Sequence, residues 1–416
     1  PLNIVVSLLL VAGGVMQTTN NNKVVSLIEP FAVDENHNVI YNSKIDLENN
    51  KVYVDKQEVK NATIIKEQLM PQGLMASQVA IKQTGTNGGG FTGTNSANPL
   101  ENPNWITNMI EMMSIILIPA ALCFTFGSAL KKEKQGYLFL CVMSVCLVIV
   151  LVLITYSEFK TIPYMNNASN FLGLGNLEGK EARFGSGLSS LWTAITTSAS
   201  SGSVNSMLDS YTPLGGMFAM LMIQLGEVIF GGVGSGLYGL VAFSIITVFI
   251  AGLMVGRTPE FLEKKIEPKE MKWAMIVALA TPLSILLGSG IAALGFVDVS
   301  SIQSGPHGFS QLLYAFTSAG GNNGSAFAGF NANTTFLNIS LALCMLFSRF
   351  TPIIGVLAFS GSLSVKKKNA VTSGTLQSDD FMFGFLLVFI ILVIGALSFF
   401  PALSLGPIAE FLGRGI

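Results

Sequence analysis

Three short stretches rich in Thr, Ser, Asn and Gly recur at similar intervals in a chain that is otherwise mostly apolar. They are Thr84–Gly90, Thr197–Ser203 and Thr317–Asn323. Each begins with Thr, contains Gly where the backbone needs conformational freedom, and has a Ser seven residues before that Thr. Because self-similarity at a nearly fixed period indicates a repeat architecture, we expect the fold to consist of repeated units.

Each stretch follows a mainly apolar segment that is too short to cross a bilayer as a helix. A short helix followed by an extended run is typical of a re-entrant pore helix with a selectivity filter. Irregular backbone at membrane depth is tolerated only where protein encloses it or water reaches it. There, carbonyl oxygens and hydroxyl groups can replace the water around a dehydrated cation. One such stretch would be an ordinary loop between helices, but three matching stretches favour a filter.

The composition is that of an integral membrane protein. The chain is 50% hydrophobic, has a mean hydropathy of +0.58 and is only 11% charged, against roughly 25% in average globular proteins. A formal net charge of −1 argues against nucleic acid as a partner. The four Cys residues lie in apolar segments without metal-ligand spacing, and the two His residues are far apart, so we expect no resident metal and no cofactor.

Apolar segments of membrane length alternate with the filter stretches. We predict seven crossings, the first incomplete, at residues 1–16, 108–130, 137–156, 213–255, 273–294, 335–361 and 381–402. Pore helices are predicted within 74–90, at 187–198 and at 307–317. Residues 17–73, with the alternating segment KVYVDKQEV, predict a small β-rich cap outside the membrane. Because the sequence opens inside an apolar run without an initiating Met, we expect that the start of a longer chain is missing.

The short loops between the crossings predict the orientation. Basic residues cluster at Lys131–Lys134, Arg257–Lys272 and Lys366–Lys368. If the pore loops are not counted as crossings, all three clusters fall on one side, which is cytoplasmic by the positive-inside rule. The filter stretches then open to the outside. An anionic-lipid or partner-docking role for these lysines is a second interpretation.

Several motifs resemble one known family along the whole sequence. They are TGTNGGGF, GGVGSGLYG, GRTPEFLEKKI, GPHGFS, NNGSAFAG, SGTL and LGPIAEFL. They resemble the potassium-binding A subunit of the bacterial Kdp potassium-transporting ATPase. The resemblance implies an all-α polytopic membrane protein of the superfamily of potassium transporters, with repeated membrane–pore–membrane units around a pseudo-fourfold pore. It also implies a non-catalytic, potassium-binding chain in the bacterial plasma membrane, whose P-type partner hydrolyses ATP and whose complex includes accessory C and small F subunits.

The resemblance also divides the chain. The implied parts are the second repeat at 1–136 with the insertion 17–73, the third at 137–256 with a broken helix near 231–236, the fourth at 257–368, and a C-terminal transmembrane helix at 369–416. Family members carry four filter runs, and the first has no counterpart in this sequence.

The residues that bind potassium follow from the same resemblance. The potassium filter is expected at Thr86, Asn87, Gly88, Gly89, Ala199, Ser200, Ser201, Gly202, Ala319, Gly320, Gly321 and Asn322. The run at Ser201–Ser203 departs from the Cys-Gly-Ala of some family members, which keeps the Gly but leaves no role for sulfur.

The 213–255 stretch is interrupted by glycines near its middle. Gly232, Gly234, Ser235 and Gly236 are predicted to form a flexible loop below the filter that acts as a gate or opens a side route for the ion. Close helix packing through the GxxxG spacing is the alternative.

Two charged residues accompany this break. Arg349 is the only basic residue within an apolar span, and charges inside membranes are usually functional. We expect a fixed positive charge below the filter that discourages leak; snorkelling or pairing with a buried acid is the alternative. Glu227, just before the break, either pairs with Arg349 or bonds exposed backbone.

The leading function is therefore selection of extracellular potassium and its delivery to an ATP-driven partner. The nearest alternative is a stand-alone potassium channel or a Trk-like potassium transporter with the same pore. A secondary transporter of organic solutes would need inverted repeats, whereas these units run in the same direction. Catalysis by this chain is disfavoured because it has neither a Walker sequence nor an Asp-Lys-Thr-Gly phosphorylation sequence.

Overall fold

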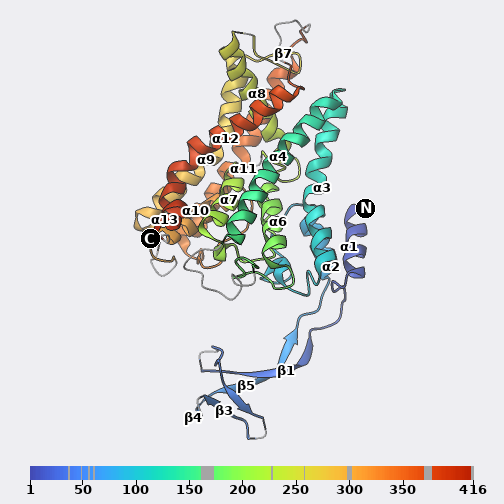
Figure 1. The fold of residues 1–416 in the computed structure, drawn as a ribbon. Coiled ribbons are helices and arrows are strands. Elements are labelled where there is room, and N and C mark those ends of the chain that lie inside the picture. Colours follow the sequence, from blue (N-terminus) through green and yellow to red (C-terminus); the bar gives the residue numbers. More distant parts are fainter. Residues whose placement is uncertain are drawn as a thin grey trace.

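The computed structural model describes residues 1–35, 38–47, 49–54, 57–59, 61–160, 173–225, 228–256, 258–297, 302–369 and 377–413. Helices form the body of the molecule, and a group of strands extends away from one end of it (Figure 1).

Six long helices make up most of this body. They are α3 (Trp105–Ala129), α4 (Glu133–Phe159), α8 (Ser235–Val255), α9 (Pro268–Ile291), α11 (Thr335–Ser364) and α12 (Phe381–Leu403). Among the described residues, these are the helices long and apolar enough to cross a bilayer. They expose large apolar side chains, such as Leu283, Leu346 and Phe385, as a lipid-facing surface does. The chain is a multi-pass membrane protein.

Two of the seven predicted membrane spans are not single helices of membrane length. The stretch 213–255 is two helices, α7 (Pro213–Gln224) and α8, so the predicted break is confirmed, although it begins at Leu225 rather than at Gly231. The stretch 1–16 contains α1 (Leu2–Ala12). At 1.5 Å per residue α1 is about 17 Å long, which is shorter than the ~30 Å hydrocarbon core of a bilayer.

Three short helices lie among the long ones, and all three predicted pore helices are confirmed. They are α2 (Met75–Thr84), α6 (Gly185–Ser198) and α10 (Pro306–Gly320). Most side chains of α6 and α10 are buried, polar ones included. α10 begins at Pro306, a position where the missing N–H would have no helical partner anyway. None of the three is long enough to cross the membrane.

The insertion 17–73 is built from strands, as predicted, but it does not cover the helices. β1 (Lys23–Val33) pairs antiparallel with β5 (Thr63–Met70). A second, three-stranded sheet contains β2 (Lys44–Asp46), β3 (Lys51–Val54) and β4 (Gln57–Glu58) in that order. Figure 1 shows these strands as an arm that stands away from the body, so the predicted cap is wrong in its placement.

The remaining elements are short. They are η1 (Asn95–Ala97), η2 (Leu208–Ser210), the hairpin β6 (Glu260–Phe261) and β7 (Lys264–Lys265), the π-helical turns η3 (Ala292–Phe296) and η5 (Ser404–Ile408), and α13 (Ala409–Gly413).

The lysine-rich loops gather at one end of the body. Lys132, between α3 and α4, lies 2.8 Å from Glu263 in the β6–β7 hairpin, and Lys368, after α11, lies 3.4 Å from the same carboxylate. Lys366 pairs with Glu270 of α9 at 2.8 Å. These ion pairs join three separate loops, so the prediction that the loops share one side is confirmed.

A polar staple joins three segments at the opposite end from these loops. His307, in the first turn of α10, places Nε2 3.1 Å from Asp209 of η2 and Nδ1 3.0 Å from Glu410 of α13. Hydrogen bonds to Asp209 and then to Glu410 raise the pKa of His307 from 6.5 to about 9. The imidazole is therefore protonated at neutral pH and holds α10 to its neighbours.

This staple predicts a pH-dependent stability. Because the folded-state pKa lies above 6.5, the contribution of His307 is complete below about pH 6.5 and is lost as the pH rises through about 9. We expect His307→Gln to lower the melting temperature of the purified protein at pH 6.5 by an amount equivalent to on the order of 2 kcal/mol. The gap from wild type should close by pH 9.5, and a gap that does not change with pH would contradict the staple.

Candidate ion-binding site

The three pore helices end in the same local structure. After each, the chain passes through one left-handed residue, and the next residue donates its N–H to the carbonyl five positions earlier. The left-handed residues are Thr86 (φ 52°), Ser200 (φ 50°) and Asn322 (φ 48°). The bonds run from Asn87 to Lys82, from Ser201 to Thr196 and from Asn323 to Ser318, each 2.9 Å. A left-handed residue other than Gly costs about 1–2 kcal/mol, so its recurrence at one place marks a built feature of the repeat.

This shared structure changes the register of the predicted filter. The residues that match Thr86–Gly89 are Ser200–Ser203 and Asn322–Ser325. The expected run at Ala319–Asn322 is therefore wrong by three residues, and that at Ala199–Gly202 by one. Ala319 and Gly320 lie in the last turn of α10, and a Cβ on Gly320 would meet Ile285 at 2.5 Å. Small residues suit both a helix end and a filter, so composition alone misplaced the boundary.

One glycine from each run meets the next run backbone to backbone. A Cβ on Gly88 would lie 2.4 Å from the Cα of Gly202, and a Cβ on Gly202 would lie 2.8 Å from the carbonyl carbon of Gly324. Gly202 is buried, whereas Gly88 and Gly324 are exposed. We call these three residues the glycine arc, because these backbone contacts link the three runs in series. Only Gly permits so close an approach.

Side chains of one run bond the backbone of another. The Ser201 hydroxyl donates to the Asn87 carbonyl at 3.1 Å, and the Ser200 hydroxyl donates to the Gly321 carbonyl at 2.8 Å. The Asn323 amide donates to the Thr196 carbonyl at 3.3 Å. The three runs are thus rich in carbonyl and hydroxyl oxygens, the kinds of ligand with which proteins replace the water shell of a monovalent cation.

Several residues that sequence reasoning missed hold the runs from behind. Trp192 of α6 donates Nε1–H to the Ser203 carbonyl at 2.9 Å, and Thr196 donates its hydroxyl to the Ser201 carbonyl at 2.7 Å. The Tyr314 hydroxyl of α10 lies 2.7 Å from the Ser325 hydroxyl. The signal that could have found them is a polar or aromatic side chain on a pore helix whose other residues are small or apolar.

The break between α7 and α8 lies against the start of two filter runs. The Gly231 N–H donates to the Ser198 carbonyl at 2.9 Å, and the Val233 N–H donates to the Thr86 hydroxyl at 3.3 Å. A Cβ on Gly236 would lie 1.9 Å from the Phe230 carbonyl oxygen, so the loop folds tightly back on itself. That contact favours the loop interpretation over GxxxG packing between helices.

The other predicted gate residues belong to the same loop or to the helices near it. Gly232 lies beside the Thr86 hydroxyl, Gly234 adopts φ 95°, and Ser235 begins α8. Glu227 lies outside the described residues. Arg349 lies on α11 and is half-buried. A role in gating stays a prediction for all of these residues.

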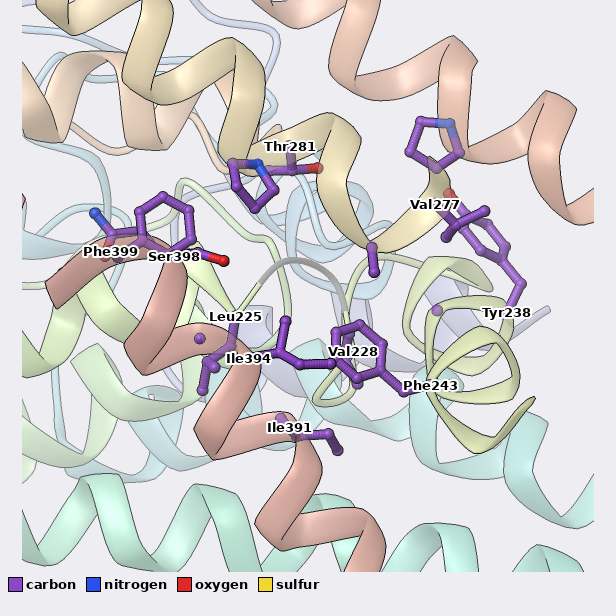
Figure 2. A pocket seen from close by; sticks show the side chains of 16 residues that line it. Leu225, Val228, Tyr238, Phe243, Val277, Thr281, Ile391, Ile394, Ser398 and Phe399 are labelled. Atoms are coloured by element: carbon purple, nitrogen blue, oxygen red, sulfur yellow. The ribbon is translucent and has the colours of Figure 1, made fainter. Parts of the chain in front are cut away.

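A cavity lies beside the break, between α8, α9 and α12 (Figure 2). Its lining is mainly apolar, and its polar groups come from Tyr238, Thr281, Ser398 and Gln224. Gln224, the last residue of α7, donates Nε2–H to the Thr317 hydroxyl of α10 at 3.0 Å. Its Oε1 is buried without a hydrogen-bond partner among the described residues. The residue that links α7 to the third pore helix therefore also lines this cavity.

Comparison with known proteins places this geometry in a family. The family model described as the potassium-transporting ATPase A subunit, KdpA, matches residues 1–412. The chain is a member of the KdpA family. Proteins of Clostridium botulinum and Clostridium perfringens are each 54% identical over 419 residues, and these matches cover 99% of the chain and 68% of each relative. A Ralstonia pickettii protein is 47% identical over 416 residues, which cover 100% of the chain and 69% of that relative. All three bear the name potassium-transporting ATPase potassium-binding subunit.

For this KdpA family member, the glycine arc predicts a mutation that damages ion selection. We expect Gly88→Ala to raise the half-saturating potassium concentration for uptake at least about tenfold, the factor that corresponds to about 1.4 kcal/mol of lost binding. The physical reason is that its methyl group would collide with the Gly202 backbone. The measurement is potassium uptake by cells that produce this protein.

Gly93→Ala is the matched control for this change. Gly93 lies five residues further along, and a Cβ there would meet nothing within 4 Å. Uptake by Gly93→Ala should equal that of wild type. If both variants had the same half-saturating concentration, the arc would not position the ion ligands.

Proposed function

We propose that this chain is the potassium-binding and translocating subunit of an ATP-driven uptake complex in the bacterial plasma membrane. The observation that carries this proposal is the glycine arc, in which three pore-helix ends of identical local structure bring their backbones together. Membership of the KdpA family and the names of the relatives support potassium as the ion.

Selection follows from the oxygen-lined arc. A potassium ion arriving from outside exchanges its water for carbonyl and hydroxyl oxygens of the three runs, at Thr86–Gly89, Ser200–Ser203 and Asn322–Ser325. Discrimination depends on the number of these oxygens and on how firmly they are held. Their low mobility comes from the side chains packed behind them, such as Trp192 and Tyr314.

Passage beyond the filter is controlled by the loop between α7 and α8. The loop bonds the Ser198 carbonyl and the Thr86 hydroxyl, so a movement of the loop changes the start of two filter runs directly. The cavity of Figure 2 is the next compartment for the ion, and Gln224 is one of the residues that line it. Glu227 and Arg349 set the electrostatic potential of this route.

Energy comes from another chain. This subunit is non-catalytic, and a P-type ATPase partner hydrolyses ATP and receives the ion. Accessory C and small F subunits complete the complex, as the resemblance to the Kdp system implies.

The proposal is tested by uptake in a bacterium that lacks its own potassium transporters. This protein, produced with its ATPase partner, should restore growth at micromolar potassium, and a partner unable to hydrolyse ATP should abolish the rescue. Uptake that continues without the partner would overturn the proposal and point to a stand-alone channel or a Trk-like transporter.

Arg349 offers a separate prediction about leak. In a complex with an inactive ATPase partner, we expect Arg349→Gln to increase passive rubidium flux at least about tenfold, the effect of removing about 1.4 kcal/mol of electrostatic barrier. Lys134→Gln removes the same charge from an exposed site at the start of α4 and should leave the flux at the wild-type level. Equal flux in the two variants would contradict a barrier at Arg349.

A further inference from the structure

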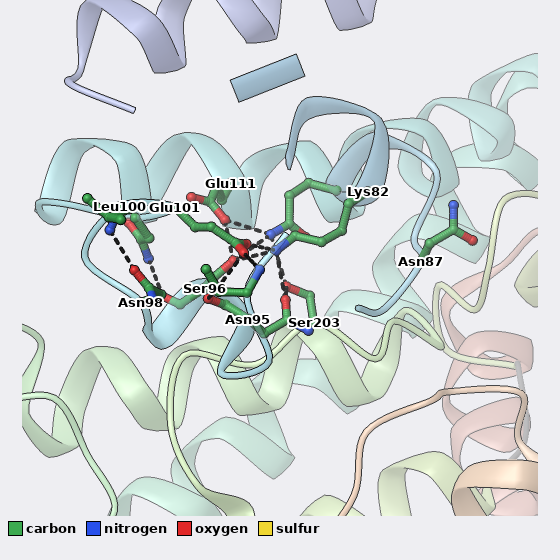
Figure 3. Close-up of polar contacts among 12 residues, drawn as sticks. Lys82, Asn87, Asn95, Ser96, Asn98, Leu100, Glu101, Glu111 and Ser203 are labelled. Atoms are coloured by element: carbon green, nitrogen blue, oxygen red, sulfur yellow. Dashed lines mark hydrogen bonds and ion pairs between the residues drawn. The ribbon is translucent and has the colours of Figure 1, made fainter. Parts of the chain in front are cut away.

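A buried polar cluster lies behind the first filter run (Figure 3). We call it the Lys82 cluster. Its members are Lys82, Gln83, Asn95, Ser96, Glu101, Glu111 and Ser203. None of them is more than 6% exposed. The proposed function so far uses none of its charged groups, and charges are costly to bury unless they are paired and hydrogen-bonded.

Lys82 and Glu101 clamp the first run at both ends. Lys82 precedes the run, in the last turn of α2, where a cation is favoured by the helix dipole. Its three N–H donors reach Glu101 at 2.8 Å, Asn95 at 2.7 Å and Ser96 at 3.0 Å. The second carboxylate oxygen of Glu101 accepts from the N–H of Thr92 at 2.6 Å, just after the run.

Glu101 also lies directly against the run between these ends. A Cβ on Gly90 would lie 2.7 Å from one carboxylate oxygen of Glu101 and 2.8 Å from the other. The carboxylate therefore fills the space that a side chain on Gly90 would occupy.

Gln83 joins this clamp to the second filter run. Its Nε2 lies 2.6 Å from Glu111 of α3, 3.1 Å from Ser96 and 2.9 Å from the Ser203 hydroxyl, and its two N–H groups are shared among these three acceptors. Ser203 belongs to the second run, and Trp192 holds its carbonyl. Glu111 accepts a further bond from Ser96 at 2.7 Å. A carboxylate on α3 thus orients a side chain that links the first pore helix to the second run.

In the other two repeats, hydroxyl groups hold the filter backbone in place of a buried ion pair. Thr196 and Ser318 occupy the position of Lys82, as their equivalent backbone bonds show. The Thr196 hydroxyl donates to the Ser201 carbonyl at 2.7 Å, and the Ser318 hydroxyl accepts from the Gly324 N–H at 2.9 Å. These hydroxyls bond their filter backbone directly, whereas Lys82 and Gln83 act through a wider network. The first run therefore depends on Glu101 and Glu111, which lie outside its pore helix α2.

We propose that Gln83 and Glu111 are positioning residues that hold the first filter run in register with the second and thereby set the discrimination between cations. Neither residue supplies a ligand to the ion. The inference rests on the proposed function, since it needs a filter in which these runs select potassium. A filter whose first run can shift loses the fixed oxygen positions on which discrimination depends.

The test compares potassium with rubidium in the native complex. Gln83→Glu replaces an amide that has two N–H donors with a carboxyl group that has at most one O–H, so the new side chain cannot donate to both Glu111 and Ser203. We expect the ratio of half-saturating rubidium to half-saturating potassium concentration to fall at least roughly threefold, with the potassium value rising roughly tenfold. The double variant Gln83→Glu with Glu111→Gln restores an amide–carboxylate pair in the opposite sense and should recover most of the wild-type ratio.

The control is a second buried ion pair, which in the described part of the chain bonds no residue of the three filter runs. Lys180 and Glu158 lie 2.7 Å apart and are fully buried, and Glu158 bonds Thr212 and Asn176. Glu158→Gln should reduce the amount of assembled complex while leaving the rubidium-to-potassium ratio unchanged. This separates loss of structure from loss of selection.

The outcomes decide between the two proposals. If the wild-type complex does not prefer potassium, the proposed function fails and this inference fails with it. If the wild-type complex does prefer potassium but Gln83→Glu keeps the wild-type ratio, or if the double variant recovers nothing, only the role of Gln83 and Glu111 is overturned. A lowered ratio for Gln83→Glu that the double variant restores supports the inference.

Discussion

The structure depends on one constraint, which is that extended backbone inside a membrane needs a partner for every polar group it does not offer to a ligand. A helix satisfies its own N–H and C=O groups, and a filter run cannot. Each pore helix therefore ends in a left-handed residue, at Thr86, Ser200 and Asn322, followed by an N–H that bonds back into the helix. This turn brings the chain into the filter with its first groups already paired, and its threefold recurrence produces the repeat.

The other buried polar groups near the filter are also explained by the requirement that its backbone be hydrogen-bonded. Ser200, Ser201 and Asn323 donate across to carbonyls of neighbouring segments, so the three runs support one another. The α7–α8 loop adds two further bonds, which ties the break in that stretch to the filter rather than to helix packing. The long apolar helices surround this polar centre and face the lipid.

Much of the architecture could be predicted because it depends on local sequence patterns. Apolar length predicts the long helices, and charge predicts that the lysine-rich loops share one side, as the Lys132–Glu263–Lys368 contacts confirm. The position of the third filter run could not be predicted from composition, because Ala319 and Gly320 suit either a helix end or a filter. The Lys82–Glu101 pair could not be predicted, because its partners are 19 residues apart and their spacing carries no signal of contact. The strands of the arm were predictable, but its position away from the body was not.

The central claim is that the three runs form one cation filter around the glycine arc. The most direct measurement is an anomalous difference map from crystals of the native complex grown in rubidium, compared with crystals grown in sodium. The account predicts a rubidium peak on the axis beside Gly88, Gly202 and Gly324, bounded by carbonyl oxygens of all three runs and absent in sodium. Rubidium bound elsewhere in the chain, with no peak beside the arc, would contradict it.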